Sequence, residues 1–412
     1  MQFFITCTPW VESVLRREIE KIGGTDLVVS DRGILCSGPD SLLAELNVWI
    51  RTGNRVYVVL AERRVRFFDE LFDTTLALDW RKYIPKDAPI MVDAVSVKSD
   101  LDSIPAIQKT LKKAIVTSIT GDRETILRED VKIPAIHIFA LIRENALLLL
   151  LDSSWEPLHK RGYRTEALEA PIKETLAAAM VMLSGWRYRE PFLDPFCGSG
   201  TIAIEAAMIA KNIAPGLKRN FAGELFPWYD AKYFKQAKEQ ARAKIITDKT
   251  YTITASDTDK EAVKIAENNA KRAGVADTIT FFVRDFKEYL GTNSGLLKKS
   301  WVFMKNEDRS ETYWKSTMNE ETEFWMKNQP FSGVLFGALV SNPPYGIRLQ
   351  DYDLDLLYKD ISIVFTKNTS LFGGIITSYD FGKYTRPESW KNRKLYNGAE
   401  LCYFYTKKFQ EK

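Results

Sequence analysis

The tetrapeptide Asn342-Pro343-Pro344-Tyr345 contains residue types that could hold a planar base in a fixed position. It follows residues 334–340, an apolar run that predicts a buried strand. Proline has no backbone N–H to donate, so two prolines end the strand in a stiff, extended turn. The Asn342 side-chain oxygen and the Pro343 carbonyl can then each accept one hydrogen of an exocyclic amine, while Tyr345 stacks on the ring. The alternative interpretation is a strand that simply ends in a proline turn.

The turn at residues 194–201, Asp-Pro-Phe-Cys-Gly-Ser-Gly-Thr, is a second candidate site between a predicted strand and a predicted helix. Its small residues allow a ligand to approach the backbone, and the start of the helix offers N–H groups to a carboxylate. Asp194 can bind an ammonium group. These properties suit the amino-acid end of S-adenosylmethionine. The residues of this turn predicted to bind the cofactor are Asp194, Phe196, Gly198, Ser199 and Gly200.

A dinucleotide site is the competing interpretation of this turn, because Gly198, Gly200 and Ala203 match the spacing of that glycine fingerprint. In such a site an acid that binds the ribose follows about 20 residues later. Here the next acid at a strand end is Asp257, which lies 57 residues after Gly200. A Walker loop is excluded, since no Gly-Lys-Ser or Gly-Lys-Thr follows.

Two further acids follow predicted strands. Asp257, with Thr258 beside it, is placed to bind both ribose hydroxyls of the cofactor. Asp285 can accept a hydrogen bond from the adenine amine, with Phe286 next to the ring. Either acid alone could be a solvated turn residue. With Asp194 they form a series at the carboxyl ends of successive strands, the edge at which open α/β sheets bind ligands.

The elements that must position these residues begin at residue 191, where predicted strands and helices alternate as in a parallel sheet covered by helices. Near the C-terminus, Asn397-Gly398 is a strong signal for a hairpin. Residues 288–330 interrupt the alternation and are interpreted as an inserted surface lobe or as a lid over the substrate. The predicted strands are 192–194, 251–255, 278–283, 334–340 and 374–378, and the predicted helices are 201–210, 260–272 and 354–365.

The N-terminal part of the chain predicts two small α+β units, residues 1–60 and 61–155. Thr8 with Pro9 predicts a helix start in the first unit. In the second, residues 104–119 form an amphipathic helix that carries Lys109, Lys112 and Lys113. This helix could contact phosphates or could be an ordinary solvated face, because basic residues alone do not identify a partner.

Composition sets limits on the class of protein. The 412 residues are enough for two or three domains, and the content of 45% hydrophobic and 27% charged residues is that of a globular protein. No apolar run approaches the roughly 18 residues of a membrane span, and no basic segment precedes the first apolar stretch, so we expect a cytoplasmic protein. The net charge of +4 permits nucleic-acid binding. Four scattered cysteines and two histidines predict no metal site.

Taken together, residues 194–201 and 342–345 resemble the motifs of class I amino-methyltransferases, and most of all the THUMP-domain RNA guanine-N2 methyltransferases that act on 23S rRNA. Residues 158–164, followed by Ala170-Pro-Ile-Lys-Glu174, are also typical of that family. The resemblance covers nearly the whole chain. It implies a ferredoxin-like unit at 1–60, a THUMP domain at 61–155, a linker and leading helix at 156–190, and a methyltransferase domain at 191–412 that contains the insertion 288–330.

The fold that this resemblance implies is α/β, a Rossmann-like sheet of seven strands that ends in an antiparallel hairpin. The chain departs from the family in two places. Residues 288–330 are longer than the usual link, and Ile347 stands where the family often has an acid.

The resemblance implies methyl transfer from S-adenosyl-L-methionine to the exocyclic N2 amine of a guanine in structured RNA, with rRNA favoured over tRNA. It implies no membrane partner, and the sequence leaves the oligomeric state open. The alternatives are a tRNA guanine-N2 methyltransferase and an adenine-N6 methyltransferase on RNA or DNA, which shares the tetrapeptide. Two more distant alternatives are a dinucleotide-dependent oxidoreductase and a non-catalytic RNA-binding protein.

Overall fold

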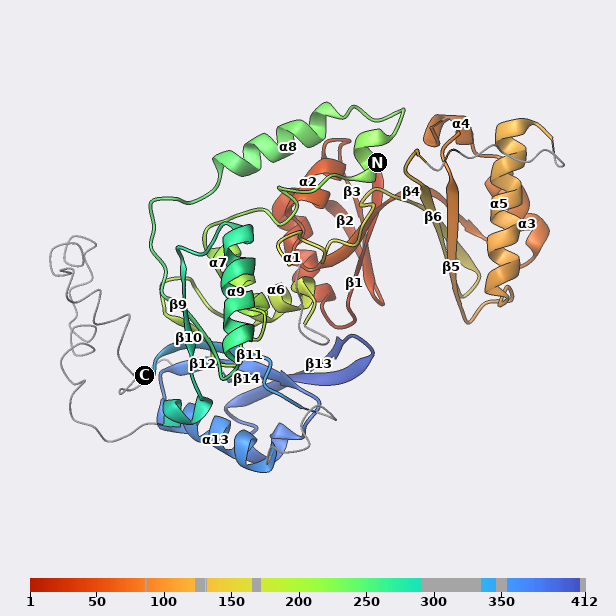
Figure 1. The fold of residues 1–412 in the computed structure, drawn as a ribbon. Coiled ribbons are helices and arrows are strands. Elements are labelled where there is room, and N and C mark those ends of the chain that lie inside the picture. The colour runs from red at the N-terminus through yellow and green to blue at the C-terminus, as the bar shows by residue number, and fades with distance from the viewer. Residues whose placement is uncertain are drawn as a thin grey trace. The chain divides into compact units, whose positions relative to one another are not determined.

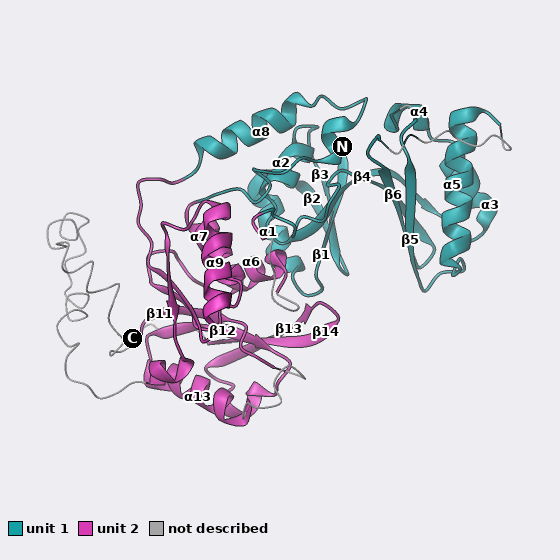
Figure 2. Cartoon of the chain, in the orientation of Figure 1, with its two compact units in different colours: residues 1–162, 212–245 teal, residues 163–211, 246–412 magenta. Residues whose placement is uncertain are grey.

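The computed structural model describes residues 1–85, 87–122, 130, 132–164, 172–290, 335–345 and 354–407. Most of the predicted insertion at 288–330 and the departure at Ile347 lie outside these residues. The chain folds into two compact units, shown in different colours in Figure 2. Unit 1 comprises residues 1–162 and 212–245, and unit 2 comprises residues 163–211 and 246–412. Figure 1 labels the elements of both units.

Unit 1 is built on a seven-stranded sheet in the order β2-β3-β1-β4-β7-β6-β5. Its long strand β4 joins the two predicted N-terminal parts, because Val58 lies opposite Phe3 of β1 and also opposite Leu151 of β7. The elements before residue 162 are β1 (Gln2–Cys7), α1 (Glu12–Ile22), β2 (Thr25–Ser30), β3 (Gly33–Ser37), α2 (Leu42–Trp49), β4 (Gly53–Arg64), α3 (Phe68–Leu76), α4 (Trp80–Tyr83), β5 (Ile90–Val97), α5 (Ile104–Thr120), β6 (Ile136–Arg143) and β7 (Ala146–Asp152).

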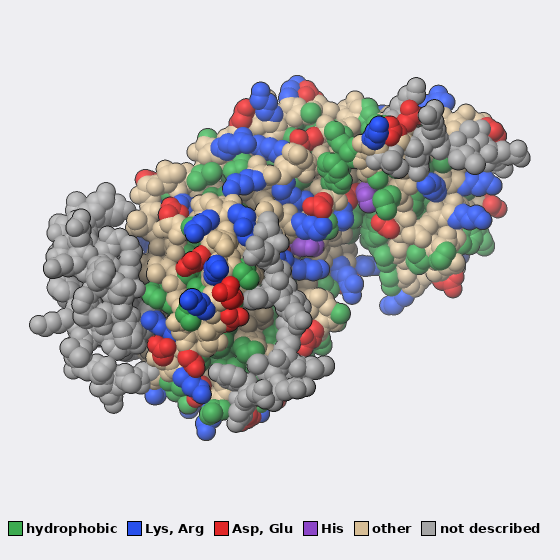
Figure 3. All heavy atoms as spheres, in the orientation of Figure 1, with side chains coloured by type: hydrophobic (Ala, Val, Ile, Leu, Met, Phe, Trp, Pro, Cys, Tyr) green, Lys and Arg blue, Asp and Glu red, His purple; other side chains and the backbone are tan. Residues whose placement is uncertain are grey.

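Of two helix predictions in unit 1, one is wrong in its start and the other is confirmed. The predicted start of the first helix at Thr8 and Pro9 is wrong, because α1 begins at Glu12 after a turn in which the Val11 N–H donates to the Thr8 carbonyl at 3.2 Å. The predicted basic helix is confirmed as α5. Its three lysines are exposed. Figure 3 shows Lys and Arg side chains spread among acidic ones over the visible face of both units, so charge alone does not locate a partner.

Residues 212–245, which include η1 (Ala222–Leu225) and α8 (Lys232–Ala243), pack in unit 1, although the sequence placed them inside the segment 191–412. Their aromatic side chains Phe221 and Phe234 are part of the core of unit 1. The Ile246 N–H donates to the Lys211 carbonyl at 2.8 Å, so the chain leaves unit 2 and returns to it at adjacent positions.

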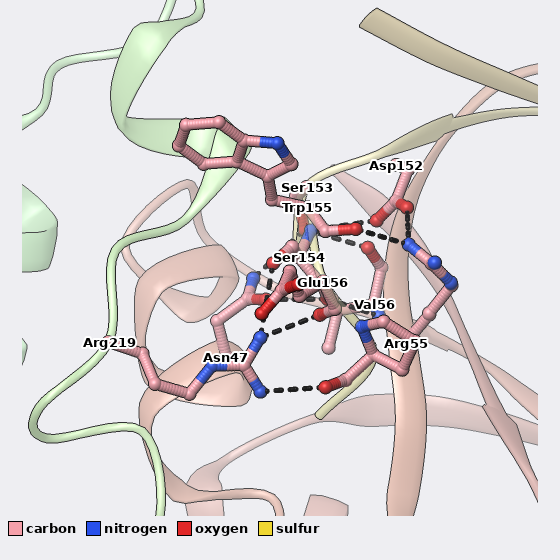
Figure 4. A network of polar contacts seen from close by, with 10 residues as sticks. Asn47, Arg55, Val56, Asp152, Ser153, Ser154, Trp155, Glu156 and Arg219 are labelled. Atoms are coloured by element: carbon pink, nitrogen blue, oxygen red, sulfur yellow. Dashed lines mark hydrogen bonds and ion pairs between the residues drawn. The ribbon is translucent and has the colours of Figure 1, made fainter. Parts of the chain in front are cut away.

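Arg219 attaches this segment to the end of β7. Its guanidinium donates to the carbonyls of Glu156 at 2.6 Å, Pro157 at 3.0 Å and Ser154 at 3.5 Å (Figure 4). Burial lowers the pKa of Arg219 to about 10, which still leaves the group charged at neutral pH. Backbone carbonyls that have left a sheet need such donors when they are buried.

Unit 2 contains the second sheet, in the order β10-β9-β8-β11-β12-β14-β13. The first five strands are parallel to one another, and β14 runs antiparallel to both of its neighbours, β12 and β13. This confirms the predicted α/β fold with a terminal hairpin. Figure 1 shows α6, α7 and α9 on one side of this sheet and α13 on the other. The elements are α6 (Glu174–Leu183), β8 (Phe192–Asp194), α7 (Thr201–Ala210), β9 (Ile253–Asp257), α9 (Lys260–Ala273), β10 (Ile279–Val283), η2 (Phe286–Leu290), β11 (Gly337–Ser341), α13 (Leu354–Lys367), β12 (Leu371–Thr377), η5 (Phe381–Tyr384), β13 (Trp390–Asn397) and β14 (Glu400–Lys407).

The described part of the chain contains neither a membrane-spanning helix nor a cluster of metal-binding side chains. None of its helices is long and apolar enough to cross a bilayer. Over the same ranges, no group of three or more His, Cys, Asp or Glu side chains could hold a metal ion.

Candidate functional site

The two candidate motifs lie next to each other in unit 2. Strand β11 pairs in parallel with β8, with Leu339 opposite Leu193, so both strands end at the same edge of the sheet. There the Ser341 hydroxyl donates a hydrogen bond to Asp194 Oδ1. The residue before the Asn-Pro-Pro-Tyr corner, residues 342–345, is therefore bonded to the first residue of the glycine turn.

Asp194 is the most unusual group at this edge. Its side chain is completely buried, and its Oδ2 atom has no hydrogen-bond partner among the residues that the structure describes. Burial raises the pKa of Asp194 to about 7, although the bond from Ser341 acts in the opposite direction. A buried carboxylate oxygen without a donor is costly in free energy. The atom is therefore a candidate acceptor for a cationic ligand group.

The corner presents a second buried acceptor, Asn342 Oδ1, which also lacks a partner within the described ranges. Among the described residues, nothing donates to the Pro343 carbonyl, whereas the Pro344 carbonyl accepts from the Tyr358 hydroxyl at 3.0 Å. Both acceptors that the sequence predicts for an amine are thus unused within the described part of the protein. Two neighbouring acceptors of this kind match an NH₂ group, which has two hydrogens to donate.

Tyr345 lies deeper than the sequence implied. Its ring is only 4% exposed, and its hydroxyl accepts hydrogen bonds from Asn397 Nδ2 at 2.7 Å and Cys402 Sγ at 3.6 Å. Burial also raises the pKa of the Tyr345 phenol, so the group stays protonated. The ring is fixed by the C-terminal hairpin, and the surface it offers to a stacking base is small.

Asp257 lies at the end of β9, beside the glycine turn. Its Oδ2 accepts from the Gly198 N–H at 2.9 Å, and its Oδ1 accepts from the Asp259 N–H at 3.1 Å. Each oxygen of an ionised carboxylate has two acceptor positions, so one remains on each atom for a ligand hydroxyl. The N–H groups of Gly198 and Gly200 are both already used as donors. That of Gly198 bonds to Asp257, and that of Gly200 bonds to the Cys197 carbonyl at 2.7 Å.

Gly200 is needed for helix packing. Its φ is +82°, and a Cβ at this position would lie 2.8 Å from the Ala266 Cβ of α9. From the same helix, Asn269 Nδ2 donates to the Ser199 carbonyl at 3.0 Å and holds the turn. The glycine therefore allows a close approach between α7 and α9. From the sequence alone, the small residues of this turn are explained by the approach of a ligand instead.

The remaining predicted cofactor residues follow β9 and β10. Asp285 Oδ1 accepts from the Lys287 N–H at 2.8 Å, and Thr258 is exposed in the turn after β9. The Phe286 ring is buried and stacks on Phe196, with the ring centroids 4.8 Å apart. Of these two rings, Phe196 is the one that is partly exposed at the site.

Four side chains at the site were not found from the sequence: Ser341, Asn269, Tyr358 and Asn397. Asn269 gave a usable signal, because it is a buried polar residue on the apolar face of α9. The other three are common residue types in ordinary positions, and their partners are distant in sequence. No local pattern distinguishes them.

Family models match three parts of the chain. Residues 2–57 match the RlmL ferredoxin-like domain, residues 65–152 the THUMP domain, and residues 161–295 the RMKL-like methyltransferase domain. A curated relative, the putative RNA methyltransferase YpsC of Bacillus subtilis, is 35% identical over 400 residues, which is 96% of this chain and 92% of the relative.

Solved structures match over the whole length. SMU.472, a putative methyltransferase complexed with SAH, is 32% identical with a TM-score of 0.79, and the match covers 100% of this chain and 98% of that one. A predicted N6-adenine-specific DNA methylase from Listeria monocytogenes is 33% identical with a TM-score of 0.78, covering 98% of this chain and 95% of that one.

The fold of unit 2 and these matches define a methyltransferase that uses S-adenosyl-L-methionine. Within that class, the chain belongs to the THUMP-domain RNA methyltransferases, the family of its relative from Bacillus subtilis. The prediction of a THUMP-domain class I RNA methyltransferase is thus confirmed, while the base and the RNA that it modifies stay predictions.

Proposed function

We propose that this protein transfers a methyl group to the exocyclic N2 amine of a guanine in structured RNA, with rRNA favoured over tRNA. The observation that carries the proposal is the buried, unpartnered Asn342 Oδ1 at the strand edge shared with Asp194. In this assignment, residues 61–155 grip the RNA and unit 2 performs the transfer.

The corner acts by positioning the amine nitrogen toward the methyl donor. The lone pair of a guanine N2 is delocalised into the ring, so the nitrogen is a poor nucleophile. Hydrogen bonds from its two N–H groups to Asn342 Oδ1 and the Pro343 carbonyl favour a pyramidal nitrogen with its lone pair directed at the methyl donor. Positioning and electrostatic stabilisation of this kind can lower a barrier by about 7–11 kcal/mol.

The cofactor supplies an electrophilic methyl group on a sulfonium. The residues that would hold it fit its polar groups. Asp194 Oδ2, which is buried and lacks a donor, would accept from the ammonium. Asp257 would use its two remaining acceptor positions for the ribose hydroxyls, and Asp285 would accept from the adenine amine beside Phe196. An ammonium next to Asp194 would also favour the ionised carboxylate.

Adenine N6 is the second candidate acceptor. An adenine also presents an NH₂ group, so the two acceptors of the corner fit either base, and one matching structure is described as a predicted N6-adenine-specific DNA methylase. Guanine N2 is favoured because the chain matches the RlmL ferredoxin-like domain in addition to THUMP. In either case a base inside a duplex must be turned out of its stack before it can reach the corner.

Nucleoside analysis tests the proposal. The protein would be incubated with unmodified total RNA and cofactor labelled in the methyl group, and the RNA would be separated by size and digested. We expect labelled N2-methylguanosine in the large rRNA. Labelled N6-methyladenosine would contradict the choice of base, and label confined to tRNA would contradict the choice of RNA.

A further inference from the structure

A chain of hydrogen bonds connects the corner to the end of the next strand. The Tyr358 hydroxyl of α13 donates to the Pro344 carbonyl at 3.0 Å and lies 2.6 Å from Thr377 Oγ1 at the end of β12. Thr377 Oγ1 also accepts from the Tyr379 N–H at 2.9 Å. All four groups belong to unit 2.

The direction of every bond in this chain is fixed by its two ends. A carbonyl can only accept and a backbone N–H can only donate. Tyr358 must therefore give its single hydroxyl hydrogen to Pro344, and Thr377 must give its hydrogen to Tyr358. The order Tyr379 N–H to Thr377, to Tyr358, to Pro344 leaves no hydroxyl free to turn away.

Packing holds the central member of the chain in place. Tyr358 and Thr377 are both completely buried. The Tyr358 ring stacks on Tyr379, with centroids 4.5 Å apart and planes inclined by 12°. Burial raises the pKa of the Tyr358 phenol, so it remains a donor throughout the neutral range.

The bond to Pro344 restrains one soft torsion of the corner, ψ of Pro344. The peptide planes are rigid, and the proline ring fixes φ, so ψ of Pro344 is the only soft dihedral between the Pro343 carbonyl and Tyr345. The orientation of the Pro344 carbonyl sets this ψ. A donor anchored in α13 therefore fixes how the Pro343 carbonyl is oriented relative to the Pro344 peptide and Tyr345.

We propose that Tyr358 is a positioning residue for methyl transfer and that Thr377 supports it. The inference rests on the proposed function of the corner, because it concerns the aim of the acceptors at Asn342 and Pro343. Tyr358 itself does not touch the substrate in this account. Its loss should slow the transfer step and leave the binding of RNA and cofactor almost unchanged.

Three substitutions test this role. In Tyr358→Phe we expect kcat to fall about tenfold, the effect of losing one hydrogen bond of about 1.4 kcal/mol, with KM for RNA and Kd for the cofactor within about twofold of wild type. Thr377→Val should lower kcat in the same direction. Thr377→Ser keeps the hydroxyl and should restore wild-type kcat, which a purely structural role for the methyl group would not predict.

Tyr405→Phe is the matched control, because Tyr405 is a buried tyrosine of the same unit for which the described residues show no hydrogen bond to residues 342–345. Equal kcat in wild type and Tyr358→Phe, or an equal fall in Tyr405→Phe, would overturn the inference. If Tyr358→Phe does not fold, the Thr377 pair decides in its place: equal kcat in Thr377→Val and Thr377→Ser would overturn it. A wild-type protein that methylates no RNA would refute the proposed function, and this inference with it. A wild-type protein that methylates RNA, together with an unchanged kcat in Tyr358→Phe, would refute this inference alone.

Discussion

Replacing Asp194 with Asn should make the protein more stable at alkaline pH while it weakens cofactor binding. The carboxyl has a pKa of about 7 in the folded chain, against an ordinary value of 3.8, because it is buried. The folded chain therefore binds this proton more tightly than the unfolded chain does. The stability that the neutral carboxyl contributes is present below about pH 4 and is lost as the pH rises to about 7.

The size of this effect follows from the two pKa values. Their difference corresponds to about 4 kcal/mol of lost stability above pH 7. Asparagine carries no charge and can still accept from Ser341, but its buried amide would lack a partner at a cost of about 1–3 kcal/mol. We expect Asp194→Asn to be more stable than wild type by about 1–3 kcal/mol at pH 8, and no more stable at pH 4.

The assay is urea unfolding of wild type and variant at pH 4, 6 and 8, with calorimetric titration of the cofactor at pH 8. Cofactor affinity should fall at least about tenfold, because the ammonium loses a charged partner. Asp277→Asn is the control, since Lys211 lowers the pKa of this exposed carboxyl, and its loss should slightly destabilise the protein at pH 8. A stability difference between wild type and Asp194→Asn that does not change with pH would refute the reasoning.

Three further substitutions should separate the parts of the site. Gly200→Ala should lower stability by about 1–3 kcal/mol, because position 200 has a left-handed backbone conformation and the added Cβ would collide with Ala266. Thermal unfolding measures this effect, and an unchanged Tm would contradict it. Asn397→Ala removes the donor to the Tyr345 hydroxyl and should lower kcat about tenfold with cofactor Kd unchanged; a weaker Kd instead would place the hairpin at the cofactor. Arg219→Ala removes the guanidinium that donates to three carbonyls, of which only that of Pro157 keeps another donor, the Lys160 N–H. We expect the stability of unit 1, measured by urea unfolding, to fall by about 2–4 kcal/mol and residues 212–245 to become open to proteolysis; continued protection of that segment would contradict this.

The fold of unit 2 could be predicted because its signals are local. The helix predicted at 201–210 is α7, and the Asn397-Gly398 turn does join β13 to β14. Parallel strands also end at one edge, so acids that follow successive strands could be expected to lie together. The structure places Asp194 and Asp257 at the ends of the neighbouring strands β8 and β9.

The rest could not be predicted because it depends on contacts between distant residues. The hydrogen bond from Ser341 to Asp194 joins residues 147 positions apart, and no local sequence pattern predicts it. Residues 212–245 contain η1 and α8 between α7 and β9, and only packing shows that they belong to unit 1. The bond from Tyr358 to Pro344 likewise joins α13 to the turn after β11, and no local pattern relates these two residues.

The most direct test of the central claim is the single-turnover rate of Asn342→Ala at saturating cofactor, on the RNA that wild type methylates, with cofactor Kd measured in parallel. Asn392→Ala, an exposed asparagine on β13, is the matched control. We expect the rate of transfer by Asn342→Ala to fall at least about a hundredfold with unchanged cofactor Kd, since one of the two acceptors for the amine is lost. A rate equal to that of wild type would contradict the claim that Asn342 positions the amine.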